Sequence, residues 1–364
     1  MEIKSCDNFF YFPQKISFKK ISHDQFLDFI KGICIIFVIL NHCMPEDIMQ
    51  KTGFFFWGDS AVPVFLIIQV FHAYKNNRKY LKTNYKKLWT RILKPFFLIE
   101  FVTIPFSYLK TCSNIGAPVS LQEFLIDILK WGGNGPGSYY PWIYIQFAII
   151  IPFLYPVFKS YKTNLSFLCL FFILISQSLE FACIYGGISD RIYRLIFIRY
   201  IYLFFLGFIL AHKGFVINTS NITIGLICLI ATSYIVYTNI DFGSFLISYP
   251  NSVCHWFCYI YIAFLLFPLL KILYYLIKEI TFIKNIIIKF GIHSYDIFLF
   301  QMVYFALIDD YIISFLNNLI NNEIIFLFFK LVLPITICMI SVIIYKRLTI
   351  YIQHCRNRNI NEIC

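Results

Sequence analysis

The sequence predicts an all-α polytopic membrane protein with about ten transmembrane helices, and three observations carry that prediction. Of its 364 residues, 59% are hydrophobic and only 14% are charged, whereas soluble domains are about half apolar and about a quarter charged. The mean hydropathy is +0.72. The apolar residues also come in blocks of about twenty, the length that crosses a bilayer as a helix. These blocks are apolar all round, whereas barrel strands alternate polar and apolar residues.

Ten such blocks follow one another along the chain. The first contains "LDFIKGICIIFVILNHC" and the last contains "IIFLFFKLVLPITICMISVIIY". Each is long enough to be a candidate span, with boundaries that a sequence defines only to within a few residues. The predicted spans cover residues 26–43, 58–74, 92–109, 141–158, 165–185, 195–212, 222–240, 255–277, 291–308 and 324–345.

The basic residues predict the orientation of these spans. The net charge is +12. With the N-terminus in the cytoplasm, 23 of the Lys and Arg residues fall in inner segments and six in outer segments. Positive charge stays on the cytoplasmic side of a membrane, so both termini are expected in the cytoplasm. The charge therefore indicates topology and contact with the lipid bilayer, and no nucleic-acid partner is expected.

The domain organisation is simple. Residues 1–25 are polar and basic, lack the apolar stretch of a signal peptide, and are expected to form a cytoplasmic segment. Residues 26–346 form one membrane domain without internal repeats, and residues 347–364 form a cytoplasmic tail. We expect a multi-pass protein of the cell (inner, cytoplasmic) membrane.

The twelve cysteines are scattered, mostly within spans. The closest pair is Cys254 and Cys258, with His255 between them. Small apolar filling explains such cysteines better than a metal site, which needs convergent ligands. We expect no metal and no tightly bound cofactor.

Two loops stand out. The outer stretch near 110–140 contains "WGGNGPGSYYPW", whose glycine and proline content predicts an irregular loop. It either lines the mouth of a cavity or merely connects two spans. The cytoplasmic loop 75–95 places Lys87 and Arg91 four residues apart, on one helical face. It is either a topology signal that also attracts anionic lipid or a phosphate clamp for a cytoplasmic donor.

The first span carries Lys31 near its start and His42 near its end. Eleven residues correspond to about 16 Å along a helix and to three turns plus about 20°, so both side chains leave the same face. Ionisable groups within a span usually face a cavity or a partner, and we expect these two to share one cavity. The alternatives are a snorkelling Lys31 helped by Asp28 and an interfacial His42. "HCMPED" also gives His42 and Asp47 the H-x4-D spacing of glycerolipid acyltransferases, which we attribute to chance because Pro45 breaks the helix.

These motifs together resemble the membrane acyltransferase-3 family, whose members commonly O-acetylate cell-surface polysaccharides. The resemblance covers about residues 25–345. The family's D-x-x-R-G pattern followed by a histidine corresponds to Asp28, Lys31, Gly32 and His42. Further similar segments are "AVPVFLIIQVF", "KKLWTRILKPFF" with Lys87, Arg91 and Pro95, "PWIYIQFAIIIPFLYPVF" with Trp142, "RYIYLFFLGFIL" with Phe205 and Gly207, and "FGIHSYDIFLFQ" with Ser294.

Three departures accompany the resemblance. The family arginine is Lys31, which keeps the charge but loses the bidentate fork. A Ser-Gly pair is replaced by Gln69 and Val70, which puts close helix packing in doubt. The late histidine is Gln301, which cannot titrate.

The resemblance implies an O-acyltransferase that takes an acyl group, usually acetyl, from cytoplasmic acyl-CoA to a hydroxyl of a cell-surface or lipid-linked glycan. Lys31, Lys87 and Arg91 would hold the phosphates of the donor. His42 would act as general base or carry the acyl group transiently. Supporting roles are expected for the intramembrane carboxyl groups and the matched motif positions, namely Asp28, Glu100, Glu180, Trp142, Ser294 and Gln301.

Two other classes stay open. A transporter or flippase for a lipid-linked saccharide would also show many spans and intramembrane charge, but the paired broken helices usual in transporters are not evident here. The third possibility is a structural subunit of a glycan-export complex.

Overall fold

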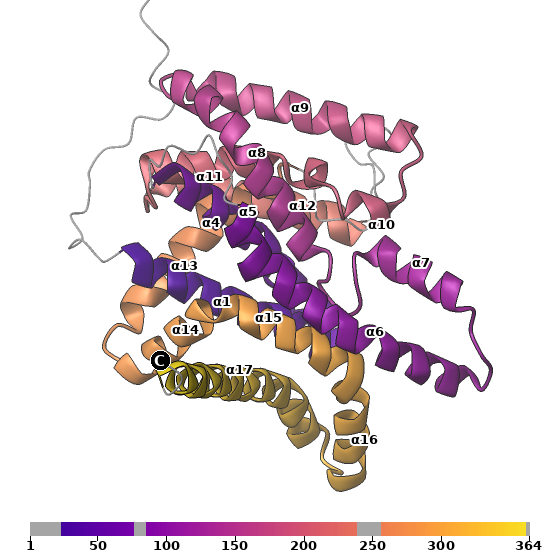
Figure 1. The fold of residues 1–364 in the computed structure, drawn as a ribbon. Coiled ribbons are helices and arrows are strands. Elements are labelled where there is room, and N and C mark those ends of the chain that lie inside the picture. The colour runs from indigo at the N-terminus through magenta and orange to yellow at the C-terminus, as the bar shows by residue number, and fades with distance from the viewer. Residues whose placement is uncertain (1–22, 76–84, 239–255, 362–364) are drawn as a thin grey trace, which may run out of the picture.

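The structure is a computed structural model that describes residues 23–75, 85–238 and 256–361. Within these ranges every regular element is a helix, and no strand occurs (Figure 1). The predicted all-helical class is therefore confirmed for the described part of the chain. Nearly all of the predicted N-terminal segment, much of the basic loop and the end of the tail lie outside the described residues.

The N-terminal half of the chain forms a series of helices linked by short turns. Its α-helices are α1 (His23–Cys43), α2 (Glu46–Thr52), α3 (Phe54–Gly58), α4 (Ala61–Lys75), α5 (Tyr85–Leu88), α6 (Lys94–Ile115), α7 (Leu121–Trp131), α8 (Tyr140–Ser160) and α9 (Leu165–Tyr185). A π-helical turn, Trp89–Leu93, joins α5 to α6.

The C-terminal half is built in the same way but is more often interrupted. Its α-helices are α10 (Asp190–Tyr193), α11 (Tyr202–Lys213), α12 (Thr219–Thr238), α13 (Phe267–Leu276), α14 (Thr281–Ile292), α15 (Ser294–Val303), α16 (Asp309–Leu319) and α17 (Glu323–Asn361). A 3₁₀ helix (Phe197–Tyr200) precedes α11, and π-helical turns (Ile262–Leu266 and Tyr304–Ile308) precede α13 and α16.

Seven described helical segments are long and apolar enough to cross a membrane. They are Gln25–Cys43, Phe56–Lys75, Tyr85–Ile115, Tyr140–Ser160, Leu165–Tyr185, Ser294–Leu319 and Glu323–Ile352, and they coincide with seven of the ten predicted spans. The other three predicted spans contain α11, α12 and α13. The apolar segments found there are shorter (Thr219–Tyr234 and Ile262–Leu276) or, as in α11, only 12 residues long, so the count of ten is not confirmed.

The first half of α1 packs closely against α14. A Cβ atom on Gly32 would overlap the carbonyl oxygen of Ile287, and one on Gly291 would overlap that of Asp28. Small residues allow helices in membranes to approach this closely. The contact fixes the start of α1, while its second half is free to face other elements.

A second close contact joins α4 to α11. A Cβ atom on Gly207 would lie 2.6 Å from the Cβ of Val70 and 2.9 Å from the carbonyl oxygen of Ile67. The departure at Gln69 and Val70 therefore does not prevent close packing, because α11 supplies the small residue. The Gln69 amide instead donates to the carbonyl oxygen of Tyr144 at 2.9 Å and ties α4 to α8.

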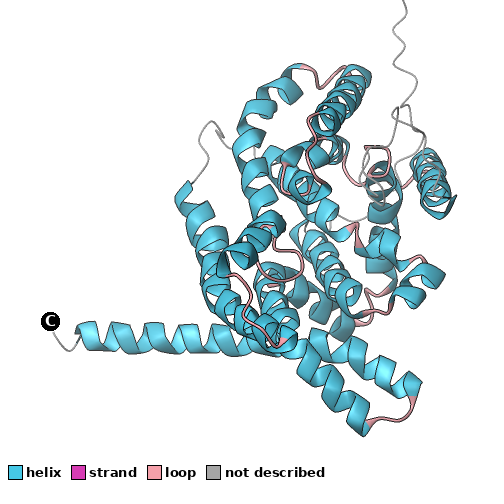
Figure 2. Cartoon of the chain, turned by 90° about the vertical axis from the view of Figure 1, so that its right-hand side faces the viewer, coloured by secondary structure: helices cyan, strands magenta, loops and turns pink. Residues whose placement is uncertain are grey.

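Helix α17 is 39 residues long and runs along one edge of the bundle (Figure 1). Its last turns project beyond the other helices (Figure 2). At the opposite edge of the view in Figure 1 lies α9. Between these two edges, buried side chains of α1, α4, α8, α11, α13 and α15 form one continuous core.

Candidate active site

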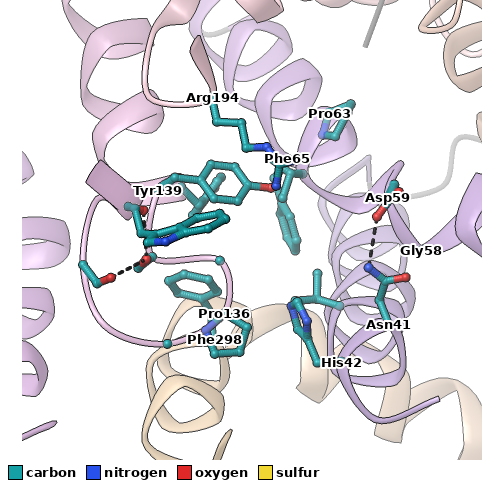
Figure 3. A pocket seen from close by; sticks show the side chains of 18 of the residues that line it. Asn41, His42, Gly58, Asp59, Pro63, Phe65, Pro136, Tyr139, Arg194 and Phe298 are labelled. Atoms are coloured by element: carbon teal, nitrogen blue, oxygen red, sulfur yellow. Dashed lines mark hydrogen bonds between the residues drawn. The ribbon is translucent and has the colours of Figure 1, made fainter. Parts of the chain in front are cut away.

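A cavity of about 530 Å³ lies among the end of α1, the start of α4, the loop between α7 and α8, the α10 region and α15. Figure 3 shows His42 on one side of it, Arg194 on another, and the bonded pair Asn41 and Asp59 beside Gly58. Pro136 of the loop lies across the hollow from Asn41. Such a mixture of aromatic walls and a few polar groups is typical of small-molecule sites.

One face of α1 forms a wall of this cavity. Ile35, Val38, Asn41 and His42 line it, as their three- and four-residue spacing requires. Lys31 precedes Ile35 by one turn on the same face, but it is not among the lining residues. Because α1 is one continuous helix from His23 to Cys43, Lys31 and His42 leave the same face, but this cavity does not reach Lys31. A cavity shared by both side chains is therefore not confirmed.

Lys31 has a different partner. Its ammonium group lies 2.6 Å from Oδ1 of Asp28, and each of the two side chains is 24% exposed. This pair is the one that the snorkelling alternative anticipated. A role of Lys31 in binding a donor stays a prediction.

His42 is exposed on the cavity side of the last turn of α1. Its ring contacts the edge of Phe305, with 5.6 Å between the centroids. Asp47 does not line the cavity, since it lies on α2, where it pairs with Lys51 at 3.6 Å. The H-x4-D spacing therefore gives His42 no carboxylate partner, as expected of a chance match.

Asn41 and Asp59 form a polar pair beside His42 that sequence reasoning missed. The Asn41 amide of α1 donates to Oδ1 of Asp59 at 3.0 Å. Asp59 lies in the junction between α3 and α4, so this bond joins α1 to that junction. A Cβ atom on Gly58 would lie 2.7 Å from the amide oxygen of Asn41, so this glycine lets the junction approach α1. The only signal in the sequence is a carboxylate at the start of the second span, in "GDSAVP".

The glycine-rich loop lines the cavity with residues 133–138. Both carboxylate oxygens of Glu100 accept the backbone N–H of Asn134, at 3.0 and 2.9 Å. The Trp142 indole donates to the carbonyl of Gly132 at 2.6 Å, and the Gln301 amide donates to that of Pro136 at 3.3 Å. The interpretation of this loop as the wall of a cavity is confirmed, and three of the predicted supporting residues hold it in place.

Basic side chains from the α10 region were missed as site residues. Arg194 and Arg199 both line the cavity, and both pair with Asp190, at 2.9 and 3.5 Å. Arg191 pairs with Asp127 of α7 at 2.9 Å. The available signal was a cluster of arginines in a segment predicted to be outer, where positive charge is rare.

The remaining predicted residues divide into two groups. Ser294 lines the cavity, whereas Lys87, Arg91 and Glu180 do not. Lys87 and Arg91 are exposed at the start of the segment that continues into α6. The cavity nevertheless reaches their neighbourhood, because the hydroxyl of its lining residue Tyr295 donates to the carbonyl of Ile92 at 2.7 Å.

The arrangement supplies an imidazole, two carboxylates and two arginines in one cavity with aromatic walls. That set suits proton transfer and the binding of a polar, hydroxyl-rich molecule. The described residues contain no group of three or more His, Cys, Asp or Glu side chains placed to hold a metal ion. That no metal is required stays a prediction.

A family model described as an acyltransferase domain matches residues 24–343. No curated protein and no solved structure gave a match to this chain. The matched range contains every residue that lines the cavity. Together with the apolar helices, it identifies a multi-pass membrane acyltransferase. The chain belongs to the acyltransferase-3 family.

Proposed function

We propose that this acyltransferase moves an acyl group, in the first instance acetyl, from cytoplasmic acyl-CoA to a hydroxyl of a cell-surface or lipid-linked glycan. The observation that carries the proposal is His42, an imidazole on the wall of a cavity large enough for a sugar residue. A neutral imidazole can take the proton of an attacking hydroxyl.

The donor would approach from the Lys31 end of the bundle. Lys31, Lys87 and Arg91 supply cations there, and phosphate groups bind well to such donors. The lining residues Ser294 and Tyr295 extend the cavity toward Arg91. This route would bring a thioester to His42 while its nucleotide stays at the basic end.

The acceptor would occupy the wider part of the cavity. Trp131, Tyr139 and Phe65 offer aromatic surface there, and Asp59 offers a carboxylate that accepts hydrogen bonds from hydroxyl groups. His42 would remove the proton of the hydroxyl that attacks the thioester and return it to the departing thiolate of CoA. Direct transfer by this base mechanism is favoured here over a transient acyl-histidine.

The first prediction tests this assignment. His42→Ala should lower acyl transfer by about 10²- to 10⁴-fold, the usual contribution of general acid–base catalysis, while glycan still reaches the cell surface. Mass spectrometry of the surface glycan measures both quantities. His212→Ala is the matched control, because His212 packs on Phe208 and does not line the cavity.

Each result has a distinct meaning. Lost acyl mass with normal polymer supports the enzyme. Lost polymer would instead identify a flippase or an export component. Full acylation by the His42→Ala variant would contradict the role of His42.

A further inference from the structure

The backbone of the glycine-rich loop contains two N–H groups without a protein acceptor. Its other amides are engaged. Those of Gly132 and Gly133 donate to carbonyls of α7, that of Asn134 to Glu100, and that of Ser138 to Gly135. The amides of Gly135 and Gly137 make no hydrogen bond within the described part of the chain.

These two amides belong to a half-buried wall of the cavity. A backbone N–H away from bulk water costs free energy if it has no acceptor. Among the described residues no protein group supplies one, which leaves solvent or a molecule bound in the cavity as the acceptor. Pro136 lies between them and has no N–H, so the two donors are separated by one residue that cannot donate.

The backbone conformation of this wall suits an anionic oxygen. The φ angle is +97° at Gly135 and +82° at Gly137, while proline fixes φ at about −65°. Alternating φ signs are the feature of concave backbone segments whose N–H groups converge on an anion. Only glycine adopts the two positive angles without strain.

The wall is also held rigidly. Glu100 binds the amide of Asn134, and the side chain of Asn134 donates to the Ser107 hydroxyl at 2.8 Å. Gln301 holds the carbonyl of Pro136 between the two free amides. Fixed donors stabilise a developing charge without having to reorganise during the reaction.

We propose that the amides of Gly135 and Gly137 form the oxyanion hole of the acyl-transfer reaction. This inference rests on the proposed function and adds the group that stabilises the transition state. As the acceptor oxygen bonds to the thioester carbon, the carbonyl π electrons move onto the carbonyl oxygen, which receives both N–H donors. His42 takes the hydroxyl proton. When the carbonyl re-forms, the C–S bond breaks and the CoA thiolate takes that proton from His42.

Side-chain donors of the cavity are partly engaged. The Asn41 amide is bound to Asp59, and Arg194 and Arg199 are paired with Asp190. A guanidinium carries five N–H donors, so this pairing does not use up the arginines. The loop is favoured because its donors belong to a backbone that is held in place, and fixed donors need not reorganise during the reaction.

The test combines two changes: the carbonyl oxygen of the acyl donor is replaced by sulfur, and a glycine of the loop is replaced by alanine. Acyl transfer by the intact enzyme is measured with acetyl-CoA and with its dithioester analogue, in which C=S replaces C=O, because sulfur accepts hydrogen bonds poorly. Each rate is divided by that of the uncatalysed reaction of the same donor. The intact enzyme should favour the oxygen donor by on the order of 100-fold, the contribution of one such donor to kcat.

Gly137→Ala should remove most of this preference. Its Cβ would lie 2.9 Å from the ring of Phe298 at a φ unsuited to alanine, so the amide must shift. The rate with the oxygen donor should fall by about 10²-fold, while the rate with the sulfur donor should change no more than in Gly116→Ala. Gly116 is the matched control, with a φ of +69° and no atom within 4 Å of an added Cβ.

The outcomes separate the two proposals. An intact enzyme that shows no preference for oxygen overturns the oxyanion hole without needing any variant. Equal losses with both donors in Gly137→Ala also overturn it, since they indicate a general structural defect. Failure of the proposed function would look different, because the intact enzyme would then transfer no acyl group from acetyl-CoA to any glycan.

Discussion

At the scale of single residues, helical geometry predicted the part of the site that lies on one element. His42 faces the same cavity as Ile35, and a spacing argument within one helix is sufficient to find that face. The same argument could not show where the cavity ends. Lys31 lies on the same face of α1, one turn before the first lining residue, Ile35, and nearby α1 packs against α14 at Gly32.

The partners of His42 could not be predicted, because they come from other elements. Asp59 stands 17 positions later in the chain, and Arg194 is much further away. No spacing rule relates such positions, and their approach depends on how the helices pack. Glu100 was found because carboxyl groups within a span demand an explanation, and Gln301 because it stands at a position of the family motif. The structure shows that both bind the loop.

The second residue-scale prediction concerns Lys31. If its ammonium group contacts a donor phosphate, Lys31→Ala should weaken acetyl-CoA binding by about tenfold, since hydrogen bonds to charged groups contribute about 1.5–3 kcal/mol. Lys31→Arg should retain most of the affinity because it keeps the charge. Calorimetric titration with acetyl-CoA measures the difference, and Lys51→Ala, in the exposed pair on α2, is the control. Equal affinities for the alanine and arginine variants would leave Lys31 as a snorkelling residue paired with Asp28.

At the scale of elements, hydropathy predicted where helices occur but not where they break. The predicted span 195–212 contains a 3₁₀ helix and the short α11 instead of one long helix. Arg199 lies at this break, and it is 9% exposed. A charged residue can be buried when it is paired, and Arg199 is paired with Asp190. A hydropathy average along the sequence cannot detect such a pair.

The third prediction concerns the crossing of α1 and α14. Gly32→Ala should destabilise the protein by about 1–3 kcal/mol or more, because overpacking forces the backbones apart. The melting temperature in detergent should fall accordingly. Gly186→Ala is the control, since Gly186 has a φ of −75° at the end of α9 and the nearest atom to an added Cβ is 3.0 Å away. An unchanged melting temperature for Gly32→Ala would mean that the two helices do not cross this closely.

At the scale of the whole molecule, most of the segments that line the cavity are predicted to lie toward one side of the membrane. The end of α1, the start of α4, the glycine-rich loop and the α10 region meet there, and the distribution of basic residues predicts that this side faces away from the cytoplasm. The donor would then enter from the opposite, basic side. The proposal that the donor enters from one side and the glycan acceptor from the other therefore depends on the orientation of the chain in the membrane.

The last prediction measures that orientation. In a bacterial host, a fluorescent protein fused after Cys364 should fluoresce, because the C-terminus is expected in the cytoplasm. Alkaline phosphatase inserted after Gly116 or Gly187, two glycines with open surroundings in turns that follow α6 and α9, should be active, because it needs an oxidising compartment to form its disulfides. A C-terminal fusion that does not fluoresce, together with inactive phosphatase fusions at both turns, would indicate the opposite orientation in the membrane. His42 and the loop would then face the cytoplasm, and a glycan acceptor outside the cell could not reach them.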